Sequence, residues 1–248
     1  MEFTSVLNHL REVTTTFDAG HLVLIDPDEF SVSDCVALVH QAEDAQTDAI
    51  LLGGSFLTTD LNPVAKTLKK ESRLPIILFP GDAMHLSPHA DAILFLSLIS
   101  GRNANFLIGE QVKAAPRLRE HAIESIPTGY MLIDSGQQTS VGFMSGTTPL
   151  PRDKFDIAWA HALAAEYLGM QLVYLEAGSG VECPVPNPMI SAIKERVNIP
   201  IIVGGGIATP EIAAQKVEAG ADFIVTGTAI ENSDSASLIK QFTDAIHG

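Results

Sequence analysis

Eight short apolar runs alternate with segments of helical spacing along this chain. The runs are continuous stretches of β-branched residues and leucine rather than strict alternations, which is typical of a parallel sheet covered on its outer face. Because right-handed connections leave few arrangements for so many parallel strands, the pattern predicts a (β/α)8 TIM barrel of the α/β class. The runs are residues 21–25, 49–52, 75–79, 92–96, 129–133, 171–175, 199–203 and 223–226.

The length of 248 residues suits such a barrel as a single domain over 1–248. Residues 3–17 precede the first run and are expected to form an N-terminal covering helix. Asn187-Pro188 and Thr209-Pro210 each predict an N-cap followed by proline at the first helical position.

Two connections depart from the regular pattern. Residues 80–91 contain Pro80, Gly81 and Pro88 and are too short and too broken for two loops and an outer helix. We therefore expect the third outer helix to be missing or replaced by extended chain. The longer connection over residues 135–152 is rich in Gly, Pro, Ser and Thr and is typical of a functional lid.

The charge balance excludes one class of partner. Fifteen Lys and Arg residues against thirty Asp and Glu residues give a net charge of −15. Such a field repels polyanions, so nucleic acid is not expected as a partner. An anionic substrate would have to be held by backbone N–H groups, a helix N-terminus or a metal ion.

No apolar run reaches the length of about 18 residues that a membrane span requires. Cys35 and Cys183 lie far apart without disulfide or metal-site spacing, and no signal peptide is recognised. These features predict a cytoplasmic protein without a transmembrane segment and leave contact with a membrane surface open.

Glycine-rich turns follow the last three runs, at residues 177–180, 204–206 and 227–228. Active sites of such barrels lie at the carboxyl ends of the strands, and the loops after the seventh and eighth strands commonly bind phosphate. Glycine lets backbone N–H groups approach an anion closely. A tight turn alone would also favour glycine, but three adjacent turns together favour a phosphate-binding cup.

Three side chains near these strand ends could carry chemistry. Glu176 precedes a glycine turn and could act as a general base for a substrate hydroxyl, or else cap a helix or pair with a lysine. Asp26 and Ser55 could offer oxygen ligands to Mg²⁺, although Asp26-Pro27 is equally typical of a turn. Arg102 and Lys113 could meet a diphosphate or lie solvated at the surface.

Several of these segments resemble one family. Leu24-Ile25-Asp26-Pro27-Asp28, Gly53-Gly54-Ser55, Leu107-Ile108-Gly109-Glu110-Gln111, Tyr174-Leu175-Glu176-Ala177-Gly178-Ser179-Gly180, Gly204-Gly205-Gly206-Ile207 and Thr226-Gly227-Thr228 look like geranylgeranylglyceryl phosphate synthase. The likeness spans nearly the whole chain. Members often show Asn-Ser where this chain has Ser100-Gly101, and Gly-Asn where it has Gly227-Thr228.

The resemblance implies a prenyltransferase of ether phospholipid biosynthesis, on a barrel whose third helix is replaced by a strand-like segment. It would join the 3-hydroxyl of sn-glycerol 1-phosphate to geranylgeranyl diphosphate in an ether bond, and release diphosphate. Asp26 and Ser55 would ligate Mg²⁺, and Glu176 would activate the hydroxyl. The residues implied to hold glycerol 1-phosphate are Tyr174, Leu175, Glu176, Ala177, Gly178, Ser179, Gly180, Gly205, Gly206, Gly227 and Thr228. Relatives form dimers or hexamers, so a homo-oligomer is expected.

The prenyl tail needs an apolar groove, and we hypothesise that it lies along the wall exposed by the missing third helix. Alternatives remain at this point. The same reaction could use another prenyl length, or the chain could be a phosphosugar-type barrel isomerase or synthase. A non-catalytic barrel that keeps its phosphate-binding turns is a further alternative, against which Asp26, Ser55 and Glu176 argue.

Overall fold

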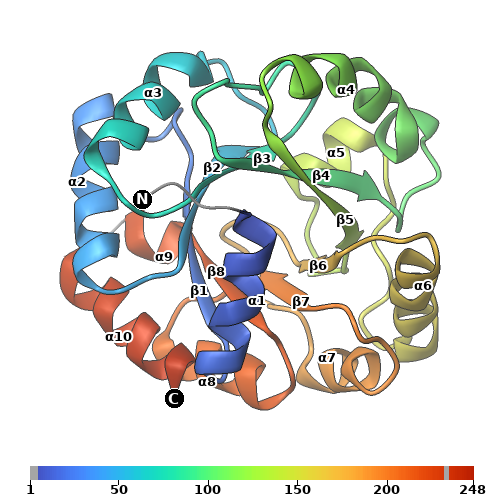
Figure 1. The fold of residues 1–248 in the computed structure, drawn as a ribbon. Coiled ribbons are helices and arrows are strands. Elements are labelled where there is room, and N and C mark those ends of the chain that lie inside the picture. Colours follow the sequence, from blue (N-terminus) through green and yellow to red (C-terminus); the bar gives the residue numbers. More distant parts are fainter. Residues whose placement is uncertain (1–4, 232–234) are drawn as a thin grey trace.

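The computed structural model describes residues 5–231 and 235–248, in which eight parallel strands form a closed barrel (Figure 1). Each strand pairs with the next one in sequence, and the last pairs with the first. The predicted (β/α)8 barrel is confirmed. The strands are β1 (Gly20–Ile25), β2 (Ala49–Gly54), β3 (Ile76–Pro80), β4 (Ala92–Leu98), β5 (Glu124–Leu132), β6 (Leu172–Glu176), β7 (Ile201–Gly204) and β8 (Phe223–Thr226).

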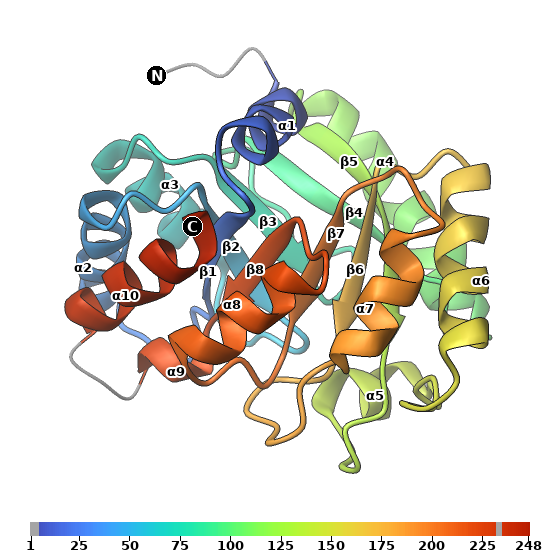
Figure 2. The ribbon, with the colours of Figure 1, turned by 90° about the horizontal axis from the view of Figure 1, so that it is seen from below.

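Helices surround the strands and bury their apolar faces against the outside of the barrel (Figures 1 and 2). Outward-facing strand residues fill the layer between sheet and helices, while inward-facing residues fill the barrel interior. The helices are α1 (Val6–Thr16), α2 (Val32–Asp44), α3 (Leu61–Glu71), the π-helical turn η1 (Asn105–Gly109), α4 (Glu110–Glu120), α5 (Ser140–Ser145), α6 (Phe155–Tyr167), α7 (Asn187–Lys194), α8 (Pro210–Glu218), α9 (Thr228–Glu231) and α10 (Ser235–His247).

Helix α1 lies across one end of the barrel, and α5 lies at the opposite end (Figure 2). The buried side chains of Val6, Leu10 and Val13 extend the interior core, which explains why this end is closed. The carboxylate of Glu124 on β5 accepts hydrogen bonds from the first turn of α1, including one of 3.1 Å from the Leu7 nitrogen. The expected covering helix is therefore present, although residues 3–4 of its range lie outside the described residues.

No helix joins β3 to β4 in the described chain, as expected from the prolines of this segment. Residues 81–91 run from one strand to the next as turns, bends and chain without regular secondary structure. Asp91 fixes the end of the segment, because its carboxylate accepts a hydrogen bond of 2.9 Å from the Ile76 nitrogen and pairs with Lys69. In the absence of that helix, η1 and α4 cover the apolar wall beside β3 and β4.

Three local expectations need correction. β5 begins at Glu124 rather than at residue 129, because the whole segment pairs with the long strand β4. The connection over residues 135–152 is not all loop but contains α5. Asn187 is not an N-cap: it is the first residue of α7, which has Pro186 before it and no side-chain cap. Thr209 does cap α8, as predicted, by accepting a hydrogen bond from the Ile212 nitrogen.

None of the helices in the described ranges has the length and apolar character needed to cross a bilayer.

Candidate active site at the carboxyl ends of the strands

A cavity of about 850 Å³ opens at the carboxyl ends of the strands. Side chains and turns from most of the strands meet there, so the topology gathers residues that lie far apart in sequence. Leu175 and Ala177 do not reach it: both are buried in the outer core, because alternate residues of a strand point to opposite faces. The anticipated site residues that line the cavity are Asp26, Ser55, Tyr174, Glu176, Gly178, Ser179, Gly180, Gly205, Gly206, Gly227 and Thr228.

The glycine turns after β6, β7 and β8 pack directly on one another. Gly205 has φ +83°, and a Cβ atom there would lie 2.5 Å from the backbone nitrogen of Gly178. The hydroxyls of Ser179 and Thr228 are hydrogen-bonded at 2.9 Å, which joins the first turn to the third. The three turns form a single concave backbone surface, hereafter the cradle (residues 178–180, 205–206 and 227–228). Such a glycine-rich surface is suited to a phosphate, because backbone N–H groups can approach an anion closely where there is no Cβ atom.

Glu176 ends β6 and faces the cradle from the barrel side. Its side chain is buried, and its Oε1 atom accepts a hydrogen bond of 2.6 Å from the Gly178 nitrogen. Burial raises the pKa of the Glu176 carboxyl to about 7, although the Gly178 N–H acts in the opposite direction. A carboxylate with this pKa can both accept and return a proton near neutral pH.

Three aromatic rings lie beneath Glu176 in the barrel interior. Phe79 stacks on Tyr174 with 5.2 Å between ring centroids, and Tyr130 meets Tyr174 edge to face at 5.3 Å. The Tyr174 hydroxyl lies close enough to Glu176 to lower the pKa of that carboxyl, yet it makes no hydrogen bond within the described residues. A buried hydroxyl without a partner is a donor that a ligand in the cavity could use.

Asp26 and Ser55 lie on the other side of the cavity, after β1 and β2. A Cβ atom on Gly54 would lie 2.5 Å from Asp26 Oδ2. Only glycine at position 54 therefore gives the Asp26 carboxylate room next to the segment that carries Ser55. Burial raises the pKa of Asp26, and the charges of Asp28 and Glu29 raise it further. A cation bound here would relieve this crowding of negative charge.

The two oxygen-bearing side chains fit Mg²⁺, which needs few protein ligands when a diphosphate supplies the others. The described ranges contain no group of three or more His, Cys, Asp or Glu side chains placed to hold a metal by themselves. The two oxygens of Asp28 are engaged by the chain itself, because they accept hydrogen bonds of 2.8 Å from the nitrogens of Thr58 and Thr59.

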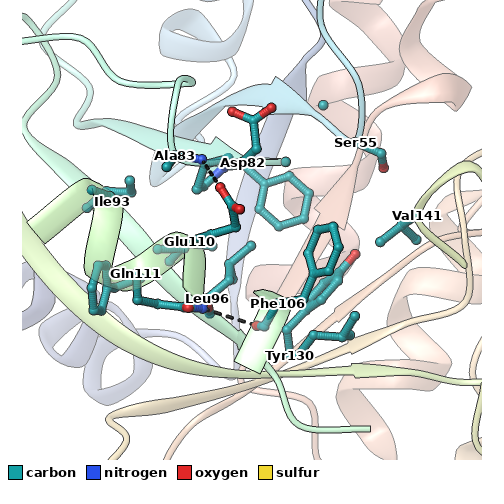
Figure 3. A pocket seen from close by; sticks show the side chains of 18 of the residues that line it. Ser55, Asp82, Ala83, Ile93, Leu96, Phe106, Glu110, Gln111, Tyr130 and Val141 are labelled. Atoms are coloured by element: carbon teal, nitrogen blue, oxygen red, sulfur yellow. Dashed lines mark hydrogen bonds between the residues drawn. The ribbon is translucent and has the colours of Figure 1, made fainter. Parts of the chain in front are cut away.

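A second, apolar pocket leads away from the main cavity between β3, β4 and α4 (Figure 3). It is the smaller of the two, with a volume of about 80 Å³ against about 850 Å³. It lies along the wall that the missing helix leaves uncovered, where the sequence predicted a groove. Five residues line both cavities and mark their junction: Gly54, Ser55, Phe79, Tyr130 and Val141.

Two polar side chains hold the walls of this apolar pocket together, and sequence reasoning gave neither a role. Glu110 Oε2 accepts a hydrogen bond of 2.9 Å from the Ala83 nitrogen, which joins α4 to the segment after β3 (Figure 3). Gln111 Nε2 donates to the carbonyl oxygen of Phe106 at 3.1 Å and to that of Leu96. The run over residues 107–111 was recognised only as part of a resemblance, because these contacts are not visible in a linear sequence.

Neither basic residue considered for a diphosphate lines either cavity. Arg102 donates hydrogen bonds to carbonyl oxygens of its own turn, the shortest being 2.7 Å to Gly101. Lys113 pairs with Glu110 at 2.6 Å. Both charges therefore serve local structure.

Comparison with known proteins gives consistent results. The model of the PcrB family matches residues 12–246. A geranylgeranylglyceryl phosphate synthase of Spirosoma linguale is 46% identical over 243 residues, which cover 96% of this chain and 98% of that protein. One of Methanosphaera stadtmanae is 46% identical over 245 residues, or 98% of this chain and 100% of that protein.

A solved structure is similar over the whole length. The crystal structure of (S)-3-O-geranylgeranylglyceryl phosphate synthase from Thermoplasma acidophilum, in complex with its substrate sn-glycerol-1-phosphate, superposes with a TM-score of 0.93. It is 38% identical in sequence, and the match covers 99% of both chains.

Proposed function

This chain belongs to the PcrB family, together with the geranylgeranylglyceryl phosphate synthases that it matches, and we propose that it joins sn-glycerol 1-phosphate to geranylgeranyl diphosphate. The products are geranylgeranylglyceryl phosphate and diphosphate. The observation that carries the proposal is the junction of a polar cavity with an apolar one at Phe79 and Tyr130. A small phosphorylated alcohol fits the first cavity, and a prenyl tail fits the second.

The cradle is assigned to the phosphate of glycerol 1-phosphate. It offers backbone N–H groups, which compensate for the scarcity of basic side chains in a chain of net charge −15. The similar structure from Thermoplasma acidophilum contains sn-glycerol-1-phosphate, which supports this ligand. With its phosphate in the cradle, the alcohol would extend toward Glu176 and the buried hydroxyl of Tyr174.

Glu176 is assigned the role of general base. The 3-hydroxyl oxygen attacks C1 of the prenyl group, the bond from C1 to the diphosphate oxygen breaks, and the hydroxyl proton passes to the Glu176 carboxylate. Phe79 and Tyr130 line the junction where C1 would lie, and their ring faces can stabilise positive charge that develops on an allylic carbon. The burial that raises the pKa of Glu176 would also limit the access of water to the base once both substrates fill the cavity.

Mg²⁺ is part of the proposal. Asp26 and Ser55 would hold it beside the junction, where it would neutralise charge on the leaving diphosphate. The negative charges of Asp28 and Glu29 beside Asp26 favour a cation at this point, and the apolar pocket begins at the neighbouring Gly54 and Ser55. The tail would then run along β3 and β4 toward α4.

A homo-oligomer, dimer or hexamer, also remains a proposal. Its support is that large apolar side chains stay exposed on the outside of the barrel, with Tyr167 and Leu168 at 79% and 75%. Mass determination in solution tests it.

The central experiment supplies the purified protein with Mg²⁺, labelled sn-glycerol 1-phosphate and prenyl diphosphates of several lengths. We expect an ether product that is abolished by EDTA and is about 10²–10⁴-fold slower to form with Glu176→Gln. The enantiomer sn-glycerol 3-phosphate is the matched control substrate. Failure to form an ether product with any prenyl length would contradict the proposal and favour the phosphosugar-type or non-catalytic alternatives.

A further inference from the structure

Two basic side chains bind the loop that joins β6 to α7, on the side away from the cavity. Arg152 and Lys216 donate hydrogen bonds to the carbonyl oxygens of three consecutive residues, Cys183, Pro184 and Val185. Neither cation lines the main cavity, so neither is expected to touch the substrate. The same loop carries Gly178 and Gly180 of the cradle.

Lys216 comes from the last turns of α8 and is buried, with 4% of its surface exposed. Its Nζ atom donates to the Val185 carbonyl oxygen at 2.7 Å and to Asn187 Oδ1 at 2.6 Å. This contact explains why Asn187 does not cap α7: its side chain is engaged by Lys216. Burial lowers the pKa of Lys216, and the charge of Arg152 lowers it further.

Arg152 is half-buried and lies in the connection between α5 and α6. One terminal nitrogen donates to the Asp134 carbonyl oxygen at 2.9 Å and to that of Cys183 at 3.3 Å. The other donates to the Pro184 carbonyl oxygen at 3.0 Å. Arg152 thus ties the end of β5 to the loop after β6.

The position of this loop sets the geometry of the next turn of the cradle. A Cβ atom on Gly206 would lie 2.8 Å from the Val181 carbonyl oxygen and 3.1 Å from the Pro184 nitrogen. The turn after β7 is therefore in contact with the loop that Arg152 and Lys216 bind. Because Pro184 and Pro186 have no N–H group, the loop has few donors of its own and depends on donors from outside.

The two positive charges form no ion pair within the described residues. Their partners are neutral oxygens, although the chain has twice as many acidic as basic residues. A buried cation without a counter-charge is costly, and an anion bound nearby reduces that cost. The cradle, on the other side of the loop, is suited to such an anion.

We propose that Lys216 and Arg152 are positioning residues for the phosphate of the substrate. They fix the loop that carries the first turn of the cradle, and they supply positive charge that is bound only to neutral oxygens. The inference rests on the proposed function of the cradle as the phosphate site. Two residues outside the cavity would thus strengthen the binding of glycerol 1-phosphate without affecting that of the prenyl diphosphate.

The test measures binding and kinetics in matched variants. Lys216→Met removes the charge and keeps the length of the side chain, whereas Lys216→Arg keeps the charge. Lys240→Met, which removes an exposed lysine paired with Asp244 on α10, is the control for net charge. Titration calorimetry with inorganic phosphate and with sn-glycerol 1-phosphate gives Kd, and initial rates give KM for each substrate.

We expect Lys216→Met to weaken binding of both phosphate probes by about tenfold or more, equivalent to at least about 1.4 kcal/mol. KM for glycerol 1-phosphate should rise in parallel, while KM for the prenyl diphosphate stays within about twofold because its site lies at Asp26 and Ser55. Lys216→Arg should recover part of the affinity, and Lys240→Met should match the wild type.

Unchanged phosphate affinity in a folded Lys216→Met protein would overturn the proposal. An equal loss of affinity for both substrates would also overturn it, because it indicates a general structural role. If Lys216→Met does not fold, Arg152→Lys decides, since it keeps the charge but loses the two-nitrogen contact with Cys183 and Pro184. Unchanged affinity there would also overturn the proposal. If Lys216→Met weakens phosphate binding but the wild-type protein forms no ether, the proposed function is refuted and this inference stands.

Discussion

The Oε1 atom of Glu176 accepts a hydrogen bond of 2.6 Å from the backbone nitrogen of Gly178, which belongs to the cradle itself. The proposed base and the first turn of the proposed phosphate site therefore belong to one short segment and are joined by this hydrogen bond. Burial raises the pKa of the Glu176 carboxyl to about 7, because it outweighs the opposite effects of the Gly178 N–H and the Tyr174 hydroxyl.

The first prediction concerns the pH dependence of the reaction. Glu176 must be ionised to accept the proton, so kcat should rise with pH and level off above about pH 7, through a single ionisation. Rates of ether formation at saturating substrates, in buffers from about pH 5 to pH 9, measure this. A flat profile through neutrality would show that Glu176 is not the base.

The same pKa predicts an effect on stability. The carboxyl ordinarily titrates near 4.5 and in the folded protein at about 7, so folding favours its protonated form. Its favourable contribution is present below about pH 4.5 and is lost as the pH rises through 7. Glu176→Gln should therefore raise the free energy of unfolding at pH 8 by up to about 3 kcal/mol, and change it little at pH 4. Urea denaturation at both pH values measures this, with the exposed Glu195→Gln as the control. Equal effects of the two variants at pH 8 would contradict the prediction.

Gly205 and Gly136 provide a matched pair for the cradle. Both have positive φ, +83° and +78°, so alanine costs about 1–2 kcal/mol of backbone strain at either position. A Cβ atom at Gly205 would also lie 2.4 Å from Glu176 Oε1, whereas nothing lies within 4 Å at Gly136. Gly205→Ala should abolish glycerol 1-phosphate binding, and Gly136→Ala should keep it. Calorimetry on both folded variants decides, and equal affinities would refute the proposed close approach.

Features encoded locally could be predicted from the sequence. The apolar runs identify the eight strands, because burial on both faces selects continuous β-branched stretches. Pro80 and Pro88 correctly indicate that the third outer helix is absent, since proline lacks the N–H that a helix interior requires. Glycine turns at the strand ends correctly indicate the cradle wall of the cavity, because a close approach of backbone segments excludes a Cβ atom.

Features that depend on contacts between distant residues could not be predicted. Glu110 binds Ala83, 27 positions away, and Lys216 binds Asn187, 29 positions away. Asn187 has the sequence pattern of an N-cap, but a buried lysine competes for its side-chain oxygen. Arg102 could be interpreted as an anion ligand only because its own carbonyl partners are not apparent in the sequence.

Asp26→Asn tests the proposed magnesium site. Losing the carboxylate should raise the Mg²⁺ concentration for half-maximal activity by at least about tenfold and leave the Kd for glycerol 1-phosphate unchanged. Asp28→Asn is the matched control, because it removes the same charge from the same cavity but from a carboxylate held by Thr58 and Thr59. If both variants shift the Mg²⁺ dependence equally, Asp26 acts through overall charge and is not a ligand.

The apolar pocket should determine the length of the prenyl chain. Ala114 on α4 lines this pocket, is buried, and is not among the residues shared with the main cavity. Ala114→Phe should fill the far part of the pocket and shift the preference toward shorter prenyl diphosphates, by about tenfold or more in the ratio of kcat/KM values, because each excluded CH₂ loses about 0.8 kcal/mol of burial. Ala115→Phe adds the same ring on the exposed side of the helix and should leave the preference unchanged. Competition assays with prenyl diphosphates of different lengths measure the ratio. An unaltered preference in Ala114→Phe would place the tail elsewhere, because a ring at this position narrows the passage between β4 and α4 that the proposed tail must follow.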